Sequence, residues 1–361
     1  FVARENIVYT SIVDVLDGVL KLVIAILLSR ISYDHLISYS SMLTCIFVFN
    51  LLALVIYASI KFPEFHVPKL RELNKDYIKG LSNFAGWTIY STGCVIARNQ
   101  GIAIILNKIF GAIVNSAYGI SLQVSASVQF VSTSIVNAMN PQIMKAEGAG
   151  ERSKMIRLCE YESKYAFLLL SMVAIPLIAE MDTILQIWLQ QVPPHTTMFC
   201  RFILIAALCD QISIGLTSAN QAIGKIKTYS LIFYTLKLLV ILAGWICLKN
   251  GLPIVSIMWC FVIIEFATSL IRLPLMKYLA DIDILSFCKN VFMRIIVPCI
   301  IMALTSYLCT KYFGMSYRII ITTILSFLIG SIAIWFTSLS NEEKLYIKTL
   351  VLKRKNNDNY R

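Results

Sequence analysis

The sequence predicts an all-α protein that crosses a membrane about ten times. Of its 361 residues, 58% belong to the apolar set and only 14% are charged, whereas soluble domains have about 45–50% apolar and about 25% charged residues. The apolar residues gather in blocks of about 20 with few or no charges, which is the length that a helix needs to span a bilayer. Together these observations exclude a soluble globular enzyme, a disordered chain and a disulfide scaffold.

Ten segments of the chain show this pattern and are the predicted spans. In chain order they are 7–29, 36–60, 84–107, 112–139, 162–179, 197–222, 228–248, 252–274, 291–310 and 317–338. The first carries three charged residues, the third carries one and the fourth carries none. The fifth is the weakest, because it is short and contains Pro176, which a transmembrane helix tolerates as a kink when its neighbours satisfy the freed carbonyl.

The connections between these segments alternate in charge, and this alternation predicts the orientation. One set of connections, together with both chain ends, holds 22 Lys and Arg residues, and the other set holds 5. Arg272 is counted in the first set. Because Lys and Arg concentrate in cytoplasmic loops, both ends of this chain are predicted to be cytoplasmic. The net charge of +12 is explained in the same way, without a nucleic-acid partner.

Metal, disulfide and catalytic motifs do not stand out. The ten cysteines are scattered, mostly inside apolar segments, and none forms a C-x-x-C pair, so they are interpreted as small buried apolar residues. The three histidines, His35, His66 and His195, lie far apart. No P-loop, G-x-S-x-G or H-E-x-x-H motif occurs. The chain is therefore not predicted to be an enzyme or to bind a cofactor or metal.

A line of polar residues follows one face of the fourth segment, within a charge-free stretch from 109 to 144. Its members recur at steps of three and four residues or their sums, which place them on one helical face: Ser116, Gly119, Gln123, Ser127, Ser134 and Asn137. One interpretation is close packing of small residues against a neighbouring helix. The other is the wall of a hydrated cavity, which the two amide side chains favour.

Charged residues inside predicted spans each need a reason, because a charge at a helix centre costs about 2.5–3.5 kcal/mol on insertion scales. Asp14, Asp17 and Lys21 share a face of the first helix, and Asp17 precedes Lys21 by the four residues that favour an ion pair. We expect the three to form a self-neutralised stripe that faces the bundle.

Arg98 lies in the middle of the third segment and cannot lose its charge. It must therefore face water, a carboxylate or an anionic ligand. Asp210, Lys237 and Glu265 are the other central charges. The two acids could pair with Arg98 or Lys237, or could titrate and couple transport to a proton or Na⁺, and the sequence leaves both possibilities open.

Several motifs resemble one known family. They read NFAGW at 83–87, QGIAIILNKIFG at 100–111, VNSAYGI at 114–120, QV at 123–124, NAMNPQI at 137–143, ILQIWL at 184–189 and AIGKIK at 222–227. Together they resemble the Wzx-type oligosaccharide flippases of the polysaccharide transporter family, which belongs to the multidrug/oligosaccharidyl-lipid/polysaccharide exporter superfamily.

The resemblance implies a fold of two six-helix lobes around a central cavity. Residues 1–62 would be the last two helices of the N-lobe, 63–83 a basic cytoplasmic linker, 84–280 the six-helix C-lobe, 281–340 an extra helix pair and 341–361 a basic cytoplasmic tail. The first four helices of the N-lobe are then expected to be missing from this sequence.

The function that the resemblance implies is transport of undecaprenyl-pyrophosphate-linked oligosaccharides across the bacterial inner membrane, for O-antigen, capsule or exopolysaccharide synthesis. The partners would be this lipid-linked substrate, the bilayer and possible polymerase or glycosyltransferase enzymes. The residues expected to line the substrate cavity are Arg98, Asn99, Gln100, Gln123, Ser127, Asn137 and Lys237. The residues expected to couple ions or to be structural are Asp14, Asp17, Lys21, Asp210 and Glu265. The alternatives are a multidrug cation antiporter of the same superfamily and an inactive fragment of a flippase.

Overall fold

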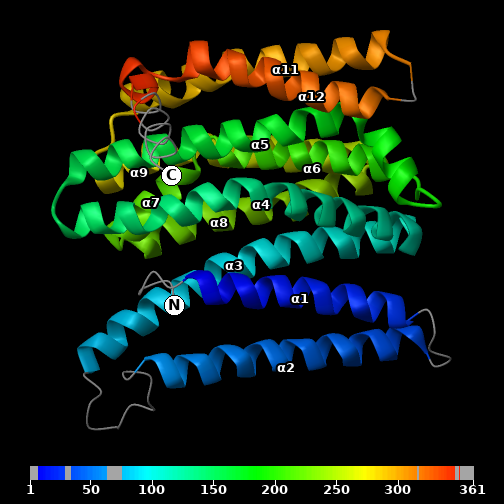
Figure 1. Cartoon of the computed structure of the whole chain (residues 1–361), viewed down its shortest axis with the longest axis horizontal. Coiled ribbons are helices and arrows are strands. Elements are labelled where there is room, and N and C mark those ends of the chain that lie inside the picture. The colour runs from blue at the N-terminus through cyan, green and yellow to red at the C-terminus, as the bar shows by residue number, and fades with distance from the viewer. Residues whose placement is uncertain (1–6, 29–33, 63–74, 315–316, 346–348, 350–361) are drawn as a thin grey trace, which may run out of the picture. The chain divides into compact units, whose positions relative to one another are not determined.

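The prediction of an all-α membrane protein is confirmed. The structure, a computed structural model, describes residues 7–28, 34–62, 75–314, 317–345 and 349. Within these ranges the regular elements are all helices, and no strand is present (Figure 1). The chain divides into two compact units, Phe1–Lys79 and Gly80–Arg361, which we call unit 1 and unit 2.

Unit 1 contains two long helices, α1 (Ile7–Leu28) and α2 (His35–Lys61). They contact each other. The rings of Tyr9 and Tyr57 stack with centroids 3.7 Å apart, and the Tyr9 hydroxyl donates to the carbonyl of Ala53 at 3.1 Å. The two helices therefore form an antiparallel hairpin, as the spacing of the first two predicted segments requires.

Unit 2 is a bundle around the long helix α5 (Arg152–Trp188), which contacts helices from both the start and the end of the unit. The helices before it are α3 (Lys75–Phe110), whose first turn precedes Gly80, and α4 (Ala112–Gly148). After it come α6 (Thr196–Gln211), α7 (Ile214–Ile223), α8 (Ile226–Lys249) and α9 (Val255–Ala280). The observed α3 begins inside the stretch predicted as a linker, so the described part of that stretch is helical.

The chain ends in a helical hairpin that packs on α5. A short α10 (Ile284–Phe287) continues through a π-helical turn, Cys288–Phe292, into α11 (Met293–Tyr312). After it, α12 (Arg318–Ala333) ends in a second π-helical turn, Ile334–Ser338. At one end of the hairpin, Arg318 Nε lies 3.0 Å from the buried Glu180 carboxylate of α5. At the other end, Lys164 of α5 pairs with Glu343.

The segment predicted as one continuous helix over 197–222 is broken, which corrects that prediction. The axes of α6 and α7 meet at 46°. The side chains of neighbouring helices take over the backbone bonds that the break frees: Arg272 donates to the carbonyl of Asp210 at 2.8 Å, and the N–H of Gly215 donates to Ser163 Oγ at 2.9 Å. A Cβ at Gly215 would lie 2.1 Å from the carbonyl oxygen of Cys159, so only glycine fits there.

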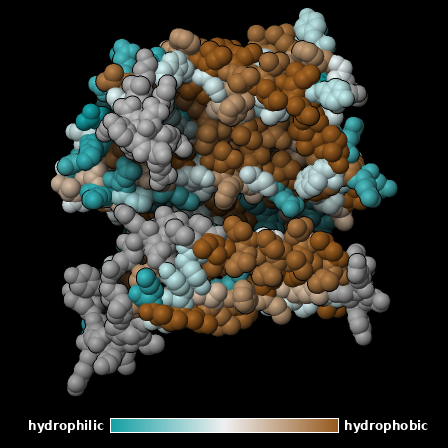
Figure 2. Space-filling view, viewed as in Figure 1, coloured by the Kyte–Doolittle hydropathy of each residue, from teal (hydrophilic) through white to brown (hydrophobic). Residues whose placement is uncertain are grey.

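Seven helices of the described chain are long and apolar enough to cross a membrane, or eight if the bent pair α6–α7 counts as one span. The predicted count of about ten included α1 and α3. These two helices are long, but α1 carries the charged residues Asp14, Asp17 and Lys21. Helix α3 is continuous, but its apolar sequence is interrupted by the polar run from Arg98 to Gln100. In Figure 2 a broad apolar surface covers the middle of the unit 2 helices, and hydrophilic residues gather towards both helix ends. Such a belt is what a bilayer requires.

Candidate functional site

A cavity of about 490 Å³ lies inside unit 2 and draws its wall from six helices. Asn99 comes from α3, Ser125 and Gln129 from α4, and Tyr234 from α8. Five charged residues also line it: Arg98 of α3, Asp210 of α6, Lys237 of α8, and Glu265 and Arg272 of α9. We call this space the charge cavity, and the five residues the charge cluster.

The charge cluster is joined by a continuous set of ion pairs. Arg98 Nη1 pairs with Glu265 Oε1, and Lys237 Nζ lies 2.8 Å from Glu265 Oε2. Lys237 Nζ also lies 2.9 Å from Asp210 Oδ1, which in turn accepts from Arg272 Nη2 at 2.8 Å. Arg98, Lys237, Glu265 and Arg272 are buried, at 8%, 5%, 3% and 2% exposure. Each charge therefore has an opposite charge beside it, as a low-dielectric interior demands.

Aromatic rings support the three cations of the cluster. The guanidinium of Arg98 lies 4.6 Å from the centroid of Phe261. Another residue of the cavity wall, Phe233, faces both Lys237 Nζ at 4.8 Å and the Arg272 guanidinium at 4.2 Å. A ring face attracts a cation through its quadrupole. The rings therefore stabilise positive charge where three cations share two carboxylates.

The sum of these charges is positive. With Arg98, Lys237 and Arg272 protonated and both acids ionised, the cluster carries one more positive than negative charge. The described residues that line the cavity include no further acid. An anion that entered the cavity would therefore balance the cluster, whereas a cation would increase its excess charge.

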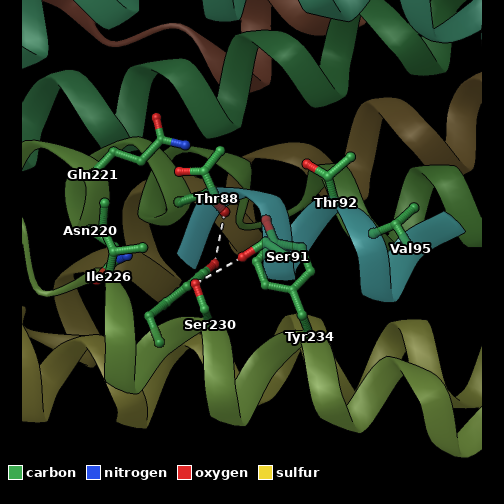
Figure 3. A pocket seen from close by; sticks show the side chains of 11 residues that line it. Thr88, Ser91, Thr92, Val95, Asn220, Gln221, Ile226, Ser230 and Tyr234 are labelled. Carbon is green, nitrogen blue, oxygen red and sulfur yellow. Dashed lines mark hydrogen bonds between the residues drawn. The ribbon is translucent and has the colours of Figure 1, made fainter. Parts of the chain in front are cut away.

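A second cavity, of about 290 Å³, adjoins the first and is lined mainly by uncharged polar groups (Figure 3). Its wall comes from α3, α7 and α8: Thr88, Ser91, Thr92, Val95, Thr217, Asn220, Gln221, Ile226, Tyr229, Ser230 and Tyr234. Figure 3 shows Ser91 and Ser230 pointing toward each other, with their Oγ atoms 2.8 Å apart. We call this space the hydroxyl cavity. It shares the lining residues Val95, Thr217 and Tyr234 with the charge cavity, so the two cavities are neighbours.

A third cavity, of about 400 Å³, lies beyond the hydroxyl cavity, where α3 approaches the turn between α7 and α8. It is lined by Trp87, Lys225 and Lys227 among others, and it shares Ile226 with the hydroxyl cavity. Lys227 Nζ lies 5.9 Å from the centroid of the Trp87 ring. The three cavities thus follow α3 from a basic and aromatic end to the buried charge cluster.

Five of the residues that the sequence singled out come together in the charge cavity: Arg98, Asn99, Asp210, Lys237 and Glu265. The expectation that the two acids could pair with Arg98 or Lys237 is confirmed by the ion pairs. Asn99 accepts a hydrogen bond from Arg98 Nε at 3.1 Å. Arg98 is therefore both a member of a buried ion pair and a residue of the cavity wall.

Four other predicted cavity residues lie elsewhere. Gln100 of α3, and Gln123, Ser127 and Asn137 of α4, are exposed and do not line the charge cavity. The part of α4 that does line it presents Ser125 and Gln129, which bond to each other at 2.8 Å. Helix α4 is thus polar on two faces, and the sequence pattern emphasised the face that points out of unit 2.

The exposed line on α4 does not pack against another described helix of unit 2. A Cβ added at Gly119 would meet no atom within 4 Å, and Ser116, Gln123, Ser127 and Ser134 are exposed. Close packing of small residues, the first interpretation of this line, is therefore not observed within the described part of unit 2.

The predicted charged stripe of unit 1 is a pair rather than a triad. Lys21 Nζ lies 2.6 Å from Asp17 Oδ2, and Asn50 of α2 donates to Asp17 Oδ1 at 2.7 Å. Asp14 and Lys21 are exposed and Asp17 is half-buried. The favourable four-residue order of Asp17 and Lys21 is confirmed, and the inclusion of Asp14 in one neutral stripe is corrected.

Sequence reasoning missed Arg272 and Lys164. Arg272 was counted with a cytoplasmic connection, but it lies within α9 and is 2% exposed. Lys164, at 1% exposure, was not singled out, and its partner Glu343 lies 179 positions away. The signal for Arg272 was its position seven residues after Glu265, which is two helical turns and therefore the same face.

Comparison of the chain with protein-family models, curated proteins and solved structures finds no match. Among the described residues, no group of three or more His, Cys, Asp or Glu side chains is placed to hold a metal ion.

Proposed function

We propose that this chain is part of a membrane transporter that moves lipid-linked oligosaccharides, with an anionic pyrophosphate head, across the bacterial inner membrane. The observation that carries the proposal is the charge cluster, which holds one excess positive charge inside a cavity of about 490 Å³. A buried excess charge is costly without a counter-ion. An anionic substrate group would supply that counter-ion during transport.

The three neighbouring cavities support a substrate with different parts. Phosphate oxygens suit Arg98, whose planar guanidinium can bond two oxygens at once, and Lys237 offers a point charge beside it. Uncharged sugar hydroxyls suit the polar wall of the hydroxyl cavity. The lipid tail would remain in the bilayer, so that no bond needs to be made or broken. Transport then consists of binding on one face and release on the other, as in alternating access.

The exposed polar line of α4 supports the same proposal. Gln123, Ser127 and Asn137 lie outside the packed interior of unit 2, and side-chain amides are unfavourable in contact with lipid. They are best satisfied by a water-filled passage or by another polar protein surface. A water-filled passage would agree with the second interpretation of the line, the wall of a hydrated cavity.

A multidrug cation antiporter fits the charge cluster less well. Such a protein needs a carboxylate available to a cationic substrate or to a coupling ion. Asp210 and Glu265 are instead each shared between two cations. A further cation in the cavity would be repelled by Arg98, Lys237 and Arg272.

The test is a translocation assay in proteoliposomes containing the protein. A fluorescent undecaprenyl-pyrophosphate oligosaccharide is added, and an impermeant quencher reports the fraction that has changed leaflet. Protein-containing vesicles should exchange the lipid faster than empty ones. Arg98→Met should slow the exchange at equal protein content. Arg201→Met is the matched control, because Arg201 pairs with Asp182 at 2.8 Å outside the cavity. Exchange no faster than in empty vesicles would reject the function.

A further inference from the structure

We propose that the hydroxyl cavity binds one uncharged sugar residue of the transported oligosaccharide, next to the anionic group held at the charge cluster. This assignment rests on the proposed function. The assignment adds a separate binding site and a ligand class to that function. It also states which part of the substrate lies in which cavity.

The chemistry of the wall points to an uncharged polyhydroxyl ligand. No charged side chain lines this cavity, so neither a phosphate nor an ammonium group would find an opposite charge there. The polar groups are hydroxyls and amides from three different helices, Thr88, Ser91 and Thr92 from α3, Asn220 and Gln221 from α7, and Ser230 from α8. Hydroxyls both donate and accept, and an amide offers one donor group and one acceptor. A sugar ring presents the complementary set of hydroxyls.

Asn220 is the residue that most needs such a ligand. It is 2% exposed, and its Oδ1 atom has no hydrogen-bond partner among the described residues. A buried acceptor without a donor costs free energy, and a bound hydroxyl would recover it. Among the same residues, the hydroxyl of Thr92 and the amide of Gln221 also form no side-chain hydrogen bond. Figure 3 shows these three side chains around the cavity.

The half-buried Tyr234 offers the apolar contact that sugars need, and the buried Tyr229 packs behind it. Tyr229 and Tyr234 of α8 line the cavity, and their ring centroids lie 6.3 Å apart at 71°. The Tyr229 hydroxyl is already bonded to Thr217 Oγ1 at 2.8 Å, so the ring is held in place. Aromatic rings combine apolar area with a polar tip, which matches the C–H face and hydroxyl rim of a sugar. The volume of about 290 Å³ is at the small end of ligand sites, appropriate to one sugar residue.

The position of the cavity defines the arrangement of the substrate. Val95, Thr217 and Tyr234 belong to both walls, so a ligand with one group in each cavity needs only to pass these three shared side chains. A sugar in the hydroxyl cavity would therefore be separated by few covalent bonds from the anionic group that neutralises Arg98 and Lys237.

The experiment is saturation-transfer NMR on the full chain in lipid nanodiscs, with glucose, galactose, rhamnose and N-acetylglucosamine as probes. At least one of these sugars should receive saturation from the protein. Asn220→Leu and Thr92→Val, which remove polar groups at similar volume, should each weaken its binding about tenfold. Thr305→Val on α11 is the matched control, because Thr305 bonds only to the carbonyl of Ile301 within its own helix. It should leave the signal unchanged.

The outcomes separate this proposal from the proposed function. If no probe receives saturation, or if Asn220→Leu and Thr92→Val bind like Thr305→Val, the sugar site is rejected even when lipid exchange is normal. If sugar binding depends on Asn220 and Thr92 but lipid exchange is absent, the site stands and the flippase function fails. If Asn220→Leu does not fold, Thr92→Val decides, because its side chain is exposed and bears no hydrogen bond that the described fold requires.

Discussion

Arg98 and Glu265, 167 positions apart in the chain, form a buried ion pair within unit 2. Glu265 also faces Lys237 at 2.8 Å, so this carboxylate serves two cations. Removing Arg98 leaves two cations and two anions in the charge cluster, whereas removing Glu265 leaves three cations and one anion. The loss of Glu265 therefore unbalances the charge cluster, whereas the loss of Arg98 balances it.

Glu265→Gln should destabilise the protein by about 3–5 kcal/mol, the usual cost of leaving a buried charge without its partner. Arg98→Met should cost less, because it balances the cluster. The double variant should be more stable than Glu265→Gln alone. Thermal melts in nanodiscs and membrane protein levels would rank the three variants. A larger loss for Arg98→Met than for Glu265→Gln would contradict the charge count.

Arg272→Lys should also be destabilising, although it preserves the charge. Arg272 Nη1 donates to the carbonyl of Asp210 at 2.8 Å, and Arg272 Nη2 donates to the carboxylate of the same residue at 2.8 Å. A lysine ammonium is a compact point charge and cannot reproduce this fork. We expect a loss of about 1–3 kcal/mol, measured as a fall in melting temperature. Arg201→Lys, at the half-exposed pair with Asp182, is the control, and an equal loss there would argue against a special role at the helix break.

The Lys164–Glu343 pair should make stability depend on pH in the acid range. Burial alone would raise the pKa of Glu343, but hydrogen bonds from Lys164, the Ser340 N–H and the Tyr165 hydroxyl outweigh it and hold that pKa below its ordinary value of 4.5. The ionised carboxylate therefore stabilises the fold fully above pH 4.5, and this contribution is lost as the pH falls through the lowered pKa. The melting temperature of wild type should exceed that of Glu343→Gln near neutral pH, and the difference should shrink on acidification. A difference in melting temperature that grows on acidification would contradict this prediction.

The topology prediction is tested by labelling single cysteines on a cysteine-free background with an impermeant maleimide. Lys154 is exposed on the first turn of α5, in a predicted cytoplasmic connection, and Gln191 is exposed in the predicted exterior connection after this helix. Lys154→Cys should react only in permeabilised cells, and Gln191→Cys should react in intact spheroplasts. The reverse pattern would invert the orientation and place both ends of this chain outside.

Lys21→Met should destabilise the protein more than the pair of changes Asp17→Asn and Lys21→Met together. The single change leaves the half-buried Asp17 without its cation, and a charge left without its partner destabilises more than no charge at all. The double change removes both charges and retains a partner for Asn50, which bonds to Asp17 at 2.7 Å. Asp14→Asn is the control, since Asp14 is exposed. Equal melting temperatures for the single and double variants would show that the pair contributes little.

The sequence by itself determined the class of protein and the problem that its charges pose. The length of each apolar segment and the cost of charge in a bilayer require helices, and they require Arg98, Asp210, Lys237 and Glu265 to find partners. Those arguments depend only on local composition and on the solvent, so a single sequence suffices for them.

Only the tertiary structure decided which partners meet. Arg98 joins Glu265 rather than Asp210, Arg272 completes the cluster, and the helix predicted over 197–222 breaks between α6 and α7. Each of these outcomes depends on the rotation of one helix against another. A helical periodicity defines which residues share a face, but the direction of that face is set by packing between segments distant in the chain. For the same reason Ser125 and Gln129 of α4 line the cavity while Gln123 and Asn137 point away from it.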